Sequence, residues 1–180
     1  FRQISVEPVI AGEDRPWALK TEHLPAIFSE YDKLTDELVR RRREGDAFHF
    51  FHFSVDLSGG PCVIKRLRGC GAGFEYVAVT PEGDLYPCHQ FVGREEYKLG
   101  NVLDGTFDRE LSGRFSSIHV FSRPECEKCW AKYYCSGGCA AANVNINGDM
   151  LKPYEIGCAM QKKRLEIAIG IAAAQQTEAV

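Results

Sequence analysis

Four cysteines within fourteen residues constrain this chain more than any other feature of its sequence. They are Cys126, Cys129, Cys135 and Cys139. Cysteines at this density are too crowded for ordinary core positions and too close together for most disulfide ladders. The glycine pair Gly137-Gly138 separates the last two and allows the backbone to turn tightly there. We therefore predict that the stretch supplies metal ligands.

Four further cysteines lie outside this stretch, namely Cys62, Cys70, Cys88 and Cys158. Thiolates of distant cysteines can close a cage begun by the short Cys126-x2-Cys129 loop, and eight thiols suffice for two iron-sulfur clusters. A tetrahedral zinc site would accept the same four thiolates, so spacing alone leaves iron-sulfur and zinc both open. A disulfide framework is disfavoured because residues 1–60 contain no cysteine and the cytosol keeps thiols reduced.

Charge and hydropathy exclude two classes of partner. The chain has 22 basic and 25 acidic residues, a formal net charge of −3, which offers no electrostatic footprint for nucleic acid or an anionic membrane. No apolar run approaches the roughly 20 residues that span a bilayer. The start lacks both Met and a signal peptide, and is typical of a strand cut from a longer protein. We expect a cytoplasmic protein without nucleic-acid or membrane partners.

The first third of the chain predicts one β/α repeat. Residues 4–10 and 47–57 are apolar and rich in β-branched or aromatic residues, which is typical of buried strands. Between them, apolar residues at helical spacing predict a helix over residues 24–43. Strand, helix and strand in this order occur at the end of a parallel barrel or an open α/β sheet.

A change of composition at residues 58–61, Ser-Gly-Gly-Pro, predicts a domain boundary. After it, residues 74–88 alternate about Gly83 and predict a β-hairpin, whereas residues 99–102 predict a short connector. Helices are expected over residues 108–117 and 156–174, the latter from its apolar residues at helical spacing.

The complete cysteine pattern resembles a known domain. Cys70-x12-Gly83-x4-Cys88, then Cys126-x2-Cys129-x5-Cys135-x3-Cys139, then Cys158 is similar to the SPASM extension at the C-terminus of radical S-adenosylmethionine (SAM) peptide-modifying enzymes. The resemblance covers about residues 62–165, and the preceding repeat resembles the last part of their partial (β/α)6 barrel. It implies an α+β fold, with residues 1–58 ending the barrel and 59–180 forming the SPASM domain of hairpin, cysteine-rich loops and C-terminal helix.

The resemblance also implies a ligand assignment. It assigns Cys70, Cys88 and Cys139 to a first auxiliary [4Fe-4S] cluster, with Cys62 as an uncertain fourth ligand. The second auxiliary cluster would be held by Cys126, Cys129, Cys135 and Cys158. The C-x3-C-x2-C motif of the SAM-cleaving cluster occurs nowhere in the sequence, so SAM and a third [4Fe-4S] cluster are expected in a missing N-terminal part, and the fragment alone should be inactive.

Four segments resemble most closely the thioether-forming maturases of six-cysteine SCIFF peptides: residues 58–62, 70–73, 79–90 and 99–102. The implied activity is oxidoreductase-type chemistry that installs thioether cross-links in a ribosomally made precursor peptide, with ferredoxin or flavodoxin as an electron carrier. The clusters, rather than an acid-base dyad, would carry the chemistry, and the catalytic residues are unknown. Two alternatives remain, a formylglycine-generating maturase and a non-catalytic zinc or iron-sulfur interaction module.

Overall fold

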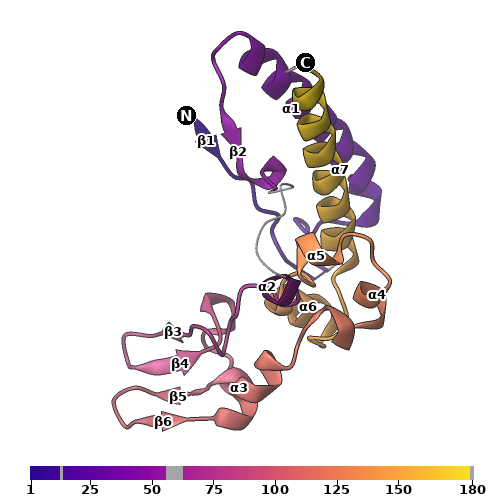
Figure 1. The fold of residues 1–180 in the computed structure, drawn as a ribbon. Coiled ribbons are helices and arrows are strands. Elements are labelled where there is room, and N and C mark those ends of the chain that lie inside the picture. Colours follow the sequence, from indigo (N-terminus) through magenta and orange to yellow (C-terminus); the bar gives the residue numbers. More distant parts are fainter. Residues whose placement is uncertain (13, 56–62, 179–180) are drawn as a thin grey trace. The chain divides into compact units, whose positions relative to one another are not determined.

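The computed structural model describes residues 1–12, 14–55 and 63–178 (Figure 1). Contacts divide the chain into two compact units. Unit 1 comprises Phe1–Cys62 and Tyr154–Val180, and unit 2 comprises Val63–Pro153. The contacts therefore group the last 27 residues with the N-terminal segment, whereas the domain division at residues 58 and 59 stays a prediction.

Unit 1 contains the predicted strand, helix and strand. Strands β1 (Gln3–Ile4) and β2 (His49–Phe50) pair in parallel, and the chain between them passes through the 3-10 turn η1 (Thr21–His23) and helix α1 (Leu24–Arg43). The helix matches its predicted bounds. Both strands are much shorter than predicted, and β2 ends at Phe50 because the chain continues directly into a 3-10 turn, η2 (Phe51–Phe53).

The prediction that residues 4–10 form a buried strand is wrong. Both residues of β1 are exposed, and within the described residues β1 pairs with β2 alone. A two-stranded sheet has too few neighbours to bury both faces of a strand. The apolar side chains of Val6 and Val9 accordingly remain more than half exposed.

The core of unit 1 lies between α1 and the long C-terminal helix α7 (Glu155–Glu178), which pack along each other. Helix α7 contains the predicted C-terminal helix. Tyr31 is a central contact of this core: its ring meets Phe53 edge-on at 5.7 Å between centroids, and its hydroxyl accepts a hydrogen bond from Arg164 Nε at 2.9 Å. The buried apolar residues of α7 include Ile156, Met160, Leu165 and Ile167.

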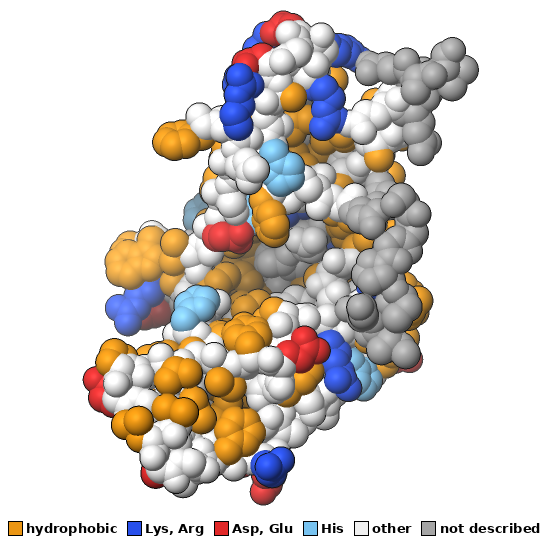
Figure 2. All heavy atoms as spheres, turned by 60° about the vertical axis from the view of Figure 1, so that its left-hand side comes forward, with side chains coloured by type: hydrophobic (Ala, Val, Ile, Leu, Met, Phe, Trp, Pro, Cys, Tyr) orange, Lys and Arg blue, Asp and Glu red, His pale blue; other side chains and the backbone are white. Residues whose placement is uncertain are grey.

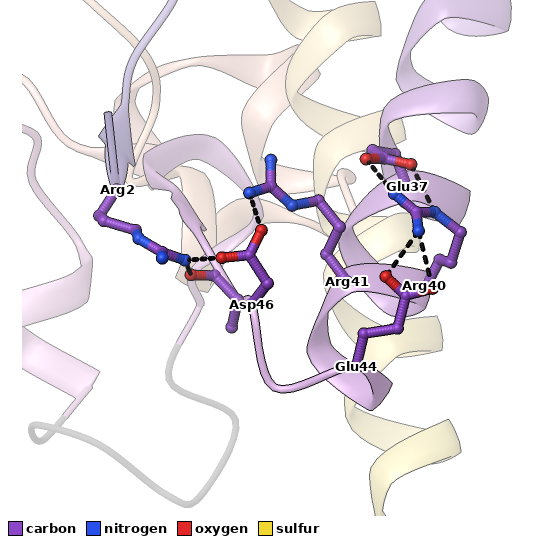
Figure 3. Close-up of polar contacts among 7 residues, drawn as sticks. Arg2, Glu37, Arg40, Arg41, Glu44 and Asp46 are labelled. Carbon is purple, nitrogen blue, oxygen red and sulfur yellow. Dashed lines mark hydrogen bonds and ion pairs between the residues drawn. The ribbon is translucent and has the colours of Figure 1, made fainter.

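Ion pairs connect the C-terminal end of α1 with the residue that precedes β1. Figure 3 shows these pairs, of Asp46 with Arg2 and Arg41, beside a second set within the end of α1, in which Arg40 pairs with Glu37 and Glu44. Asp46 accepts from both Arg41 and Arg2, and these hydrogen bonds hold the pKa of its carboxyl below the usual range. Arg2 Nη1 also donates to the carbonyl of Ala47 at 3.0 Å. The turn between α1 and β2 is thereby fixed to the first strand.

Unit 2 contains a four-stranded antiparallel meander in the order β3 (Ala78–Val79), β4 (Asp84–Tyr86), β5 (Gly100–Asn101) and β6 (Thr106–Phe107). The β3–β4 hairpin was predicted, and Gly83 takes a φ of 86° at its turn. Residues 99–102 were expected to connect, yet residues 100 and 101 form β5 because they pair with both β4 and β6.

Helix α3 (Arg109–Ser116) follows the meander, as predicted, and its N-cap Asp108 accepts from the amide of Leu111 at 2.8 Å. Leu111 and Phe115 from this helix join a buried cluster with Leu85, Phe91 and Leu99. By contrast, Val79, Val102, Leu103 and Phe107 are exposed, and Figure 2 shows hydrophobic side chains gathered over the sheet of unit 2.

Short elements complete unit 2. They are α2 (Val63–Arg66), η3 (His89–Phe91), η4 (Glu95–Tyr97), η5 (Val120–Ser122), α4 (Pro124–Glu127), α5 (Lys132–Cys135) and α6 (Ala140–Asn147). Helix α2 packs against α5, and α4 packs against η5. Helix α6 was not predicted, since its run of small alanines shows no apolar periodicity, although Ala141 to Val144 are all buried.

A buried arginine organises the loop between α5 and α6. The loop passes through three consecutive left-handed residues, Ser136, Gly137 and Gly138, with φ of 57°, 87° and 73°. Arg123, only 2% exposed, donates to the carbonyl of Gly137 and, at 2.9 Å, to that of Met150. One guanidinium thus joins the start of α4 to two later segments of the chain.

Replacing Leu165 by Ala should destabilise unit 1. Leu165 is 1% exposed, and removing its buried methyl groups should lower the free energy of unfolding by about 2–5 kcal/mol. Ile169→Ala on the same helix is the control, because Ile169 is 43% exposed and its loss should stay below about 1 kcal/mol. Urea unfolding followed by circular dichroism would measure both, and equal losses would contradict the α1–α7 core.

Replacing Gly137 by Ala should destabilise unit 2. The added Cβ would lie 2.5 Å from Arg123 Nη1, and the left-handed backbone alone costs about 1–2 kcal/mol for a residue with a Cβ. Gly113→Ala makes the same change inside α3, where nothing lies within 4 Å, and should raise stability by up to about 1 kcal/mol. Thermal unfolding of the two variants should move in opposite directions; a neutral Gly137→Ala would argue against the Arg123 anchor.

Candidate metal centre

All seven cysteines in the described part of the chain are free thiols. Cys62, the eighth, lies outside the described residues, so its predicted role is not addressed by the structure. Six of the seven lie in unit 2, and Cys158 lies near the start of α7 in unit 1. The assignment of Cys158 to the second cluster therefore stays a prediction.

Cys70, Cys88 and Cys139 form a first thiol group. They come from three different places: the loop after α2, the residue before η3 and the residue before α6. Burial raises the pKa of Cys88, and the nearby Cys139 and Cys70 raise it further, while the amides of Gln90 and Phe91 oppose the shift. Cys88 is buried, whereas Cys70 and Cys139 are exposed. The group thus has one enclosed thiol and two on its open side.

Two side chains donate hydrogen bonds to the exposed thiols of this first group. Tyr76 Oη lies 3.5 Å from Cys70 Sγ, and Gln90 Nε2 lies 3.9 Å from Cys139 Sγ. The hydrogen bond to Cys70, with burial and the charges of all three thiols, raises the pKa of Tyr76. The phenol therefore stays protonated and able to donate.

Cys126, Cys129 and Cys135 form a second thiol group. Burial is the main cause of the raised pKa of Cys126, to which Cys129 adds, while the charge and hydrogen bond of Arg123 oppose it. Burial also raises the pKa of Cys135, with contributions from Cys126 and Cys129, against the hydrogen bonds of the amides that follow it. The three thiols are thus close enough together for the charge of one to affect the pKa of another.

The two groups interleave along the sequence. Cys139 follows Cys135 by only four residues, yet the charge of Cys139 acts on Cys88 and Tyr76 of the first group, whereas Cys126 and Cys129 act on Cys135. The left-handed turn at residues 136–138 separates the two thiols, and Arg123 holds that turn. Of the donors near the thiols, Tyr76, Gln90 and Arg123 were not singled out in the sequence, since nothing in the cysteine spacing marks them.

Groups of thiols such as these are the donor type that both zinc and iron-sulfur clusters use. Within residues 1–12, 14–55 and 63–178, no three His, Cys, Asp or Glu side chains lie close enough to hold a single metal ion. A zinc ion requires thiolates at about 2.3 Å, whereas a cluster that contains inorganic sulfide spaces its thiolates further apart. A cavity of about 40 Å³ lies beside Cys70, and its lining includes Gly69, Gly71 and Gly138.

Two glycines keep side chains away from this cavity. A Cβ on Gly69 would lie 3.2 Å from the carbonyl oxygen of Gly138, and one on Gly71 would lie 2.5 Å from the carboxylate of Glu75. Gly71 also has a φ of 79°, which favours glycine. The backbone next to Cys70 can therefore approach the loop that precedes Cys139.

Comparison with known proteins agrees with these features. Residues 70–130 match the family model of the SPASM domain, an iron-sulfur cluster-binding domain. Mycofactocin maturase MftC of Mycobacterium ulcerans is 33% identical over 128 residues, 67% of this chain and 33% of that protein. MftC of Mycolicibacterium smegmatis is 35% identical over 102 residues, 54% of this chain and 25% of that protein.

A third relative is the antilisterial bacteriocin subtilosin biosynthesis protein AlbA of Bacillus subtilis, 27% identical over 96 residues, 48% of this chain and 20% of that protein. The chain thus spans between a fifth and a third of the length of these relatives. No helix in the described residues is both long and apolar enough to cross a membrane.

The fold matches solved structures over nearly the whole chain. The structure of native anSMEcpe with bound AdoMet and Kp18Cys peptide superposes with a TM-score of 0.62 at 20% identity, covering 95% of this chain and 48% of that one. The predicted mixed α+β fold is confirmed by this likeness. Residues 70–130 of the chain therefore form an iron-sulfur cluster-binding SPASM domain, and the chain is homologous to the radical SAM/SPASM maturase MftC and to AlbA.

Proposed function

We propose that this chain is the auxiliary-cluster portion of a radical SAM enzyme that installs thioether cross-links in a ribosomally made precursor peptide. The observation that carries the proposal is the match of residues 70–130 to the iron-sulfur cluster-binding SPASM domain, and the division of six thiols of unit 2 into two interleaved groups supports it. Two relatives are named as a maturase and as a bacteriocin biosynthesis protein, which supports a peptide as substrate. The proposal that the cross-link is a thioether rests on the resemblance to the SCIFF maturases.

Two auxiliary [4Fe-4S] clusters would be held as the thiol groups suggest. Cys70, Cys88 and Cys139, with Cys62, would hold the first, and Cys126, Cys129 and Cys135, with Cys158, the second. When bound, such clusters accept and pass on single electrons at potentials set by burial and hydrogen bonds.

The side chains around the first group have distinct tasks. The buried Cys88 would anchor the cluster away from water, and the amides of Gln90 and Phe91 would stabilise its thiolate. The exposed Cys70 and Cys139 would place the open side of the group toward a peptide. These residues bind and orient; none of them is placed to act as an acid-base dyad.

The remaining parts of the enzyme would lie outside these 180 residues. No C-x3-C-x2-C motif occurs in them, so SAM cleavage and a third cluster would come from another part of the protein, and the chain alone would be inactive. Ferredoxin or flavodoxin would exchange electrons with it in the cytoplasm. A formylglycine-generating maturase is the alternative enzyme, and its thiol set would be the same.

Anaerobic reconstitution with iron and sulfide should load about eight irons per chain, since each [4Fe-4S] cluster contains four. Cys88→Ala and Cys129→Ala should each lose about half of the iron, because each removes a ligand of one cluster. His89→Ala is the control: His89 is exposed beside Cys88, and its loss should leave the iron content unchanged. Zinc without sulfide in the purified protein would instead indicate the non-catalytic module.

Cys62→Ala should change the spectrum of the first cluster, because we propose Cys62 as its fourth ligand in the resting state. The electron paramagnetic resonance spectrum of the reduced protein would be recorded in the Cys129→Ala background, which leaves the first cluster to be observed. A spectrum identical with and without Cys62 would contradict the ligand role and leave the fourth iron open for a substrate thiol.

A further inference from the structure

Tyr76 and Gln90 are held beside the first thiol group by their local backbone. The carbonyl of Tyr76 accepts from the amide of Gly73 at 2.9 Å, which closes a small loop that begins at Cys70. Gln90 lies in η3, which is anchored by the next residue, Phe91, with no exposed surface. Both side chains therefore come from fixed turns rather than from free loops.

The three thiols of this group differ in their source of hydrogen bonds. Cys88, the enclosed one, interacts with backbone amides of Gln90 and Phe91. The two exposed thiols accept from side chains, Cys70 from the phenol of Tyr76 and Cys139 from the amide of Gln90. The open side of the group, where water would otherwise solvate the sulfurs, thus carries a directed donor at each sulfur.

We propose that Tyr76 and Gln90 are positioning residues that raise the reduction potential of the first auxiliary cluster by donating to its two exposed thiolates. The inference rests on the proposed function, because it requires that this group hold a cluster. A hydrogen bond to sulfur draws electron density from it and so favours the reduced cluster, which carries more negative charge. Both donors are neutral, so they favour reduction without altering the net charge of the protein.

The two donors act at different ligands and should act separately. Tyr76 donates its hydrogen bond to Cys70 and Gln90 donates its hydrogen bond to Cys139, so the effects of removing the two donors should add. With these donors, the first cluster would be a better electron acceptor than a cluster at an otherwise similar site without them. That property suits a cluster that takes up the electron released when a sulfur-carbon bond closes.

Redox titration of the reconstituted protein, followed by electron paramagnetic resonance, tests the proposal. Tyr76→Phe and Gln90→Leu keep the shape of each side chain but lose its donor, and each should shift the midpoint potential of the first cluster to more negative values. The double variant should shift it by about the sum. Gln90→Glu, which places a carboxylate near Cys139, should shift it further than Gln90→Leu.

Tyr134→Phe is the matched control, because Tyr134 is a similarly exposed tyrosine next to Cys135 of the second group and should leave the first potential unchanged. Unshifted potentials in variants with full iron content would overturn the inference and leave the proposed function intact. Loss of iron from Tyr76→Phe and Gln90→Leu would also overturn it, in favour of a purely structural role. A wild-type protein that binds no cluster would instead refute the proposed function.

Discussion

The placement of the thiols in unit 2 depends on one buried cation. Arg123 donates a hydrogen bond to the carbonyl of Gly137, within a turn of three left-handed residues, and it also interacts with the thiol of Cys126. A buried guanidinium is tolerated only where carbonyls and polar groups compensate for its lost hydration. The same contacts that solvate Arg123 therefore fix the direction in which the chain leaves Cys135, and so bring Cys139 to the other thiol group.

Both thiol groups contain buried thiols, and the first group also has two exposed thiols. Burial raises the pKa of Cys88, Cys126 and Cys135, so free thiols at these positions resist ionisation until a positively charged partner arrives. Binding of a cluster must displace the protons of these thiols, so the loading of the cluster should depend on pH. Cys70 and Cys139, in contrast, meet solvent and side-chain donors.

Much of the fold could be predicted from the sequence, and the failures have physical causes. Apolar periodicity is a local signal, and it marks helices such as α1 and α7. A glycine at the turn is another local signal, and it marks the β3–β4 hairpin. Helix α3 was also predicted. Helix α6 lacks such a signal, because alanines can be buried without an apolar stripe. Residues 4–10 are apolar like a central strand, but strand burial depends on neighbours that a local pattern does not specify.

The cysteines stand out in the sequence, whereas the side chains around them do not, and the roles of the cysteines as ligands stay a prediction. Cysteine spacing, read through a family resemblance, implied that Cys139 would leave Cys135, and the structure places its charge near Cys88. Nothing comparable marks Tyr76, Gln90 or Arg123, because a hydrogen-bond donor to sulfur can come from any segment that happens to fold nearby. Such residues are found only once the chain is arranged in space.

The make-up of unit 1 from two separated segments has a consequence for biosynthesis. The apolar face of α1, with Tyr31 and Leu38, is covered by α7, which leaves the ribosome only after all of unit 2 has been made. Unit 2, a continuous segment, can fold as soon as it emerges, whereas α1 must wait with its face exposed. Binding of iron and sulfide by Cys70, Cys88 and Cys139 of the nascent unit 2 would fall within this interval, whereas Cys158, the proposed fourth ligand of the second cluster, is made only with α7.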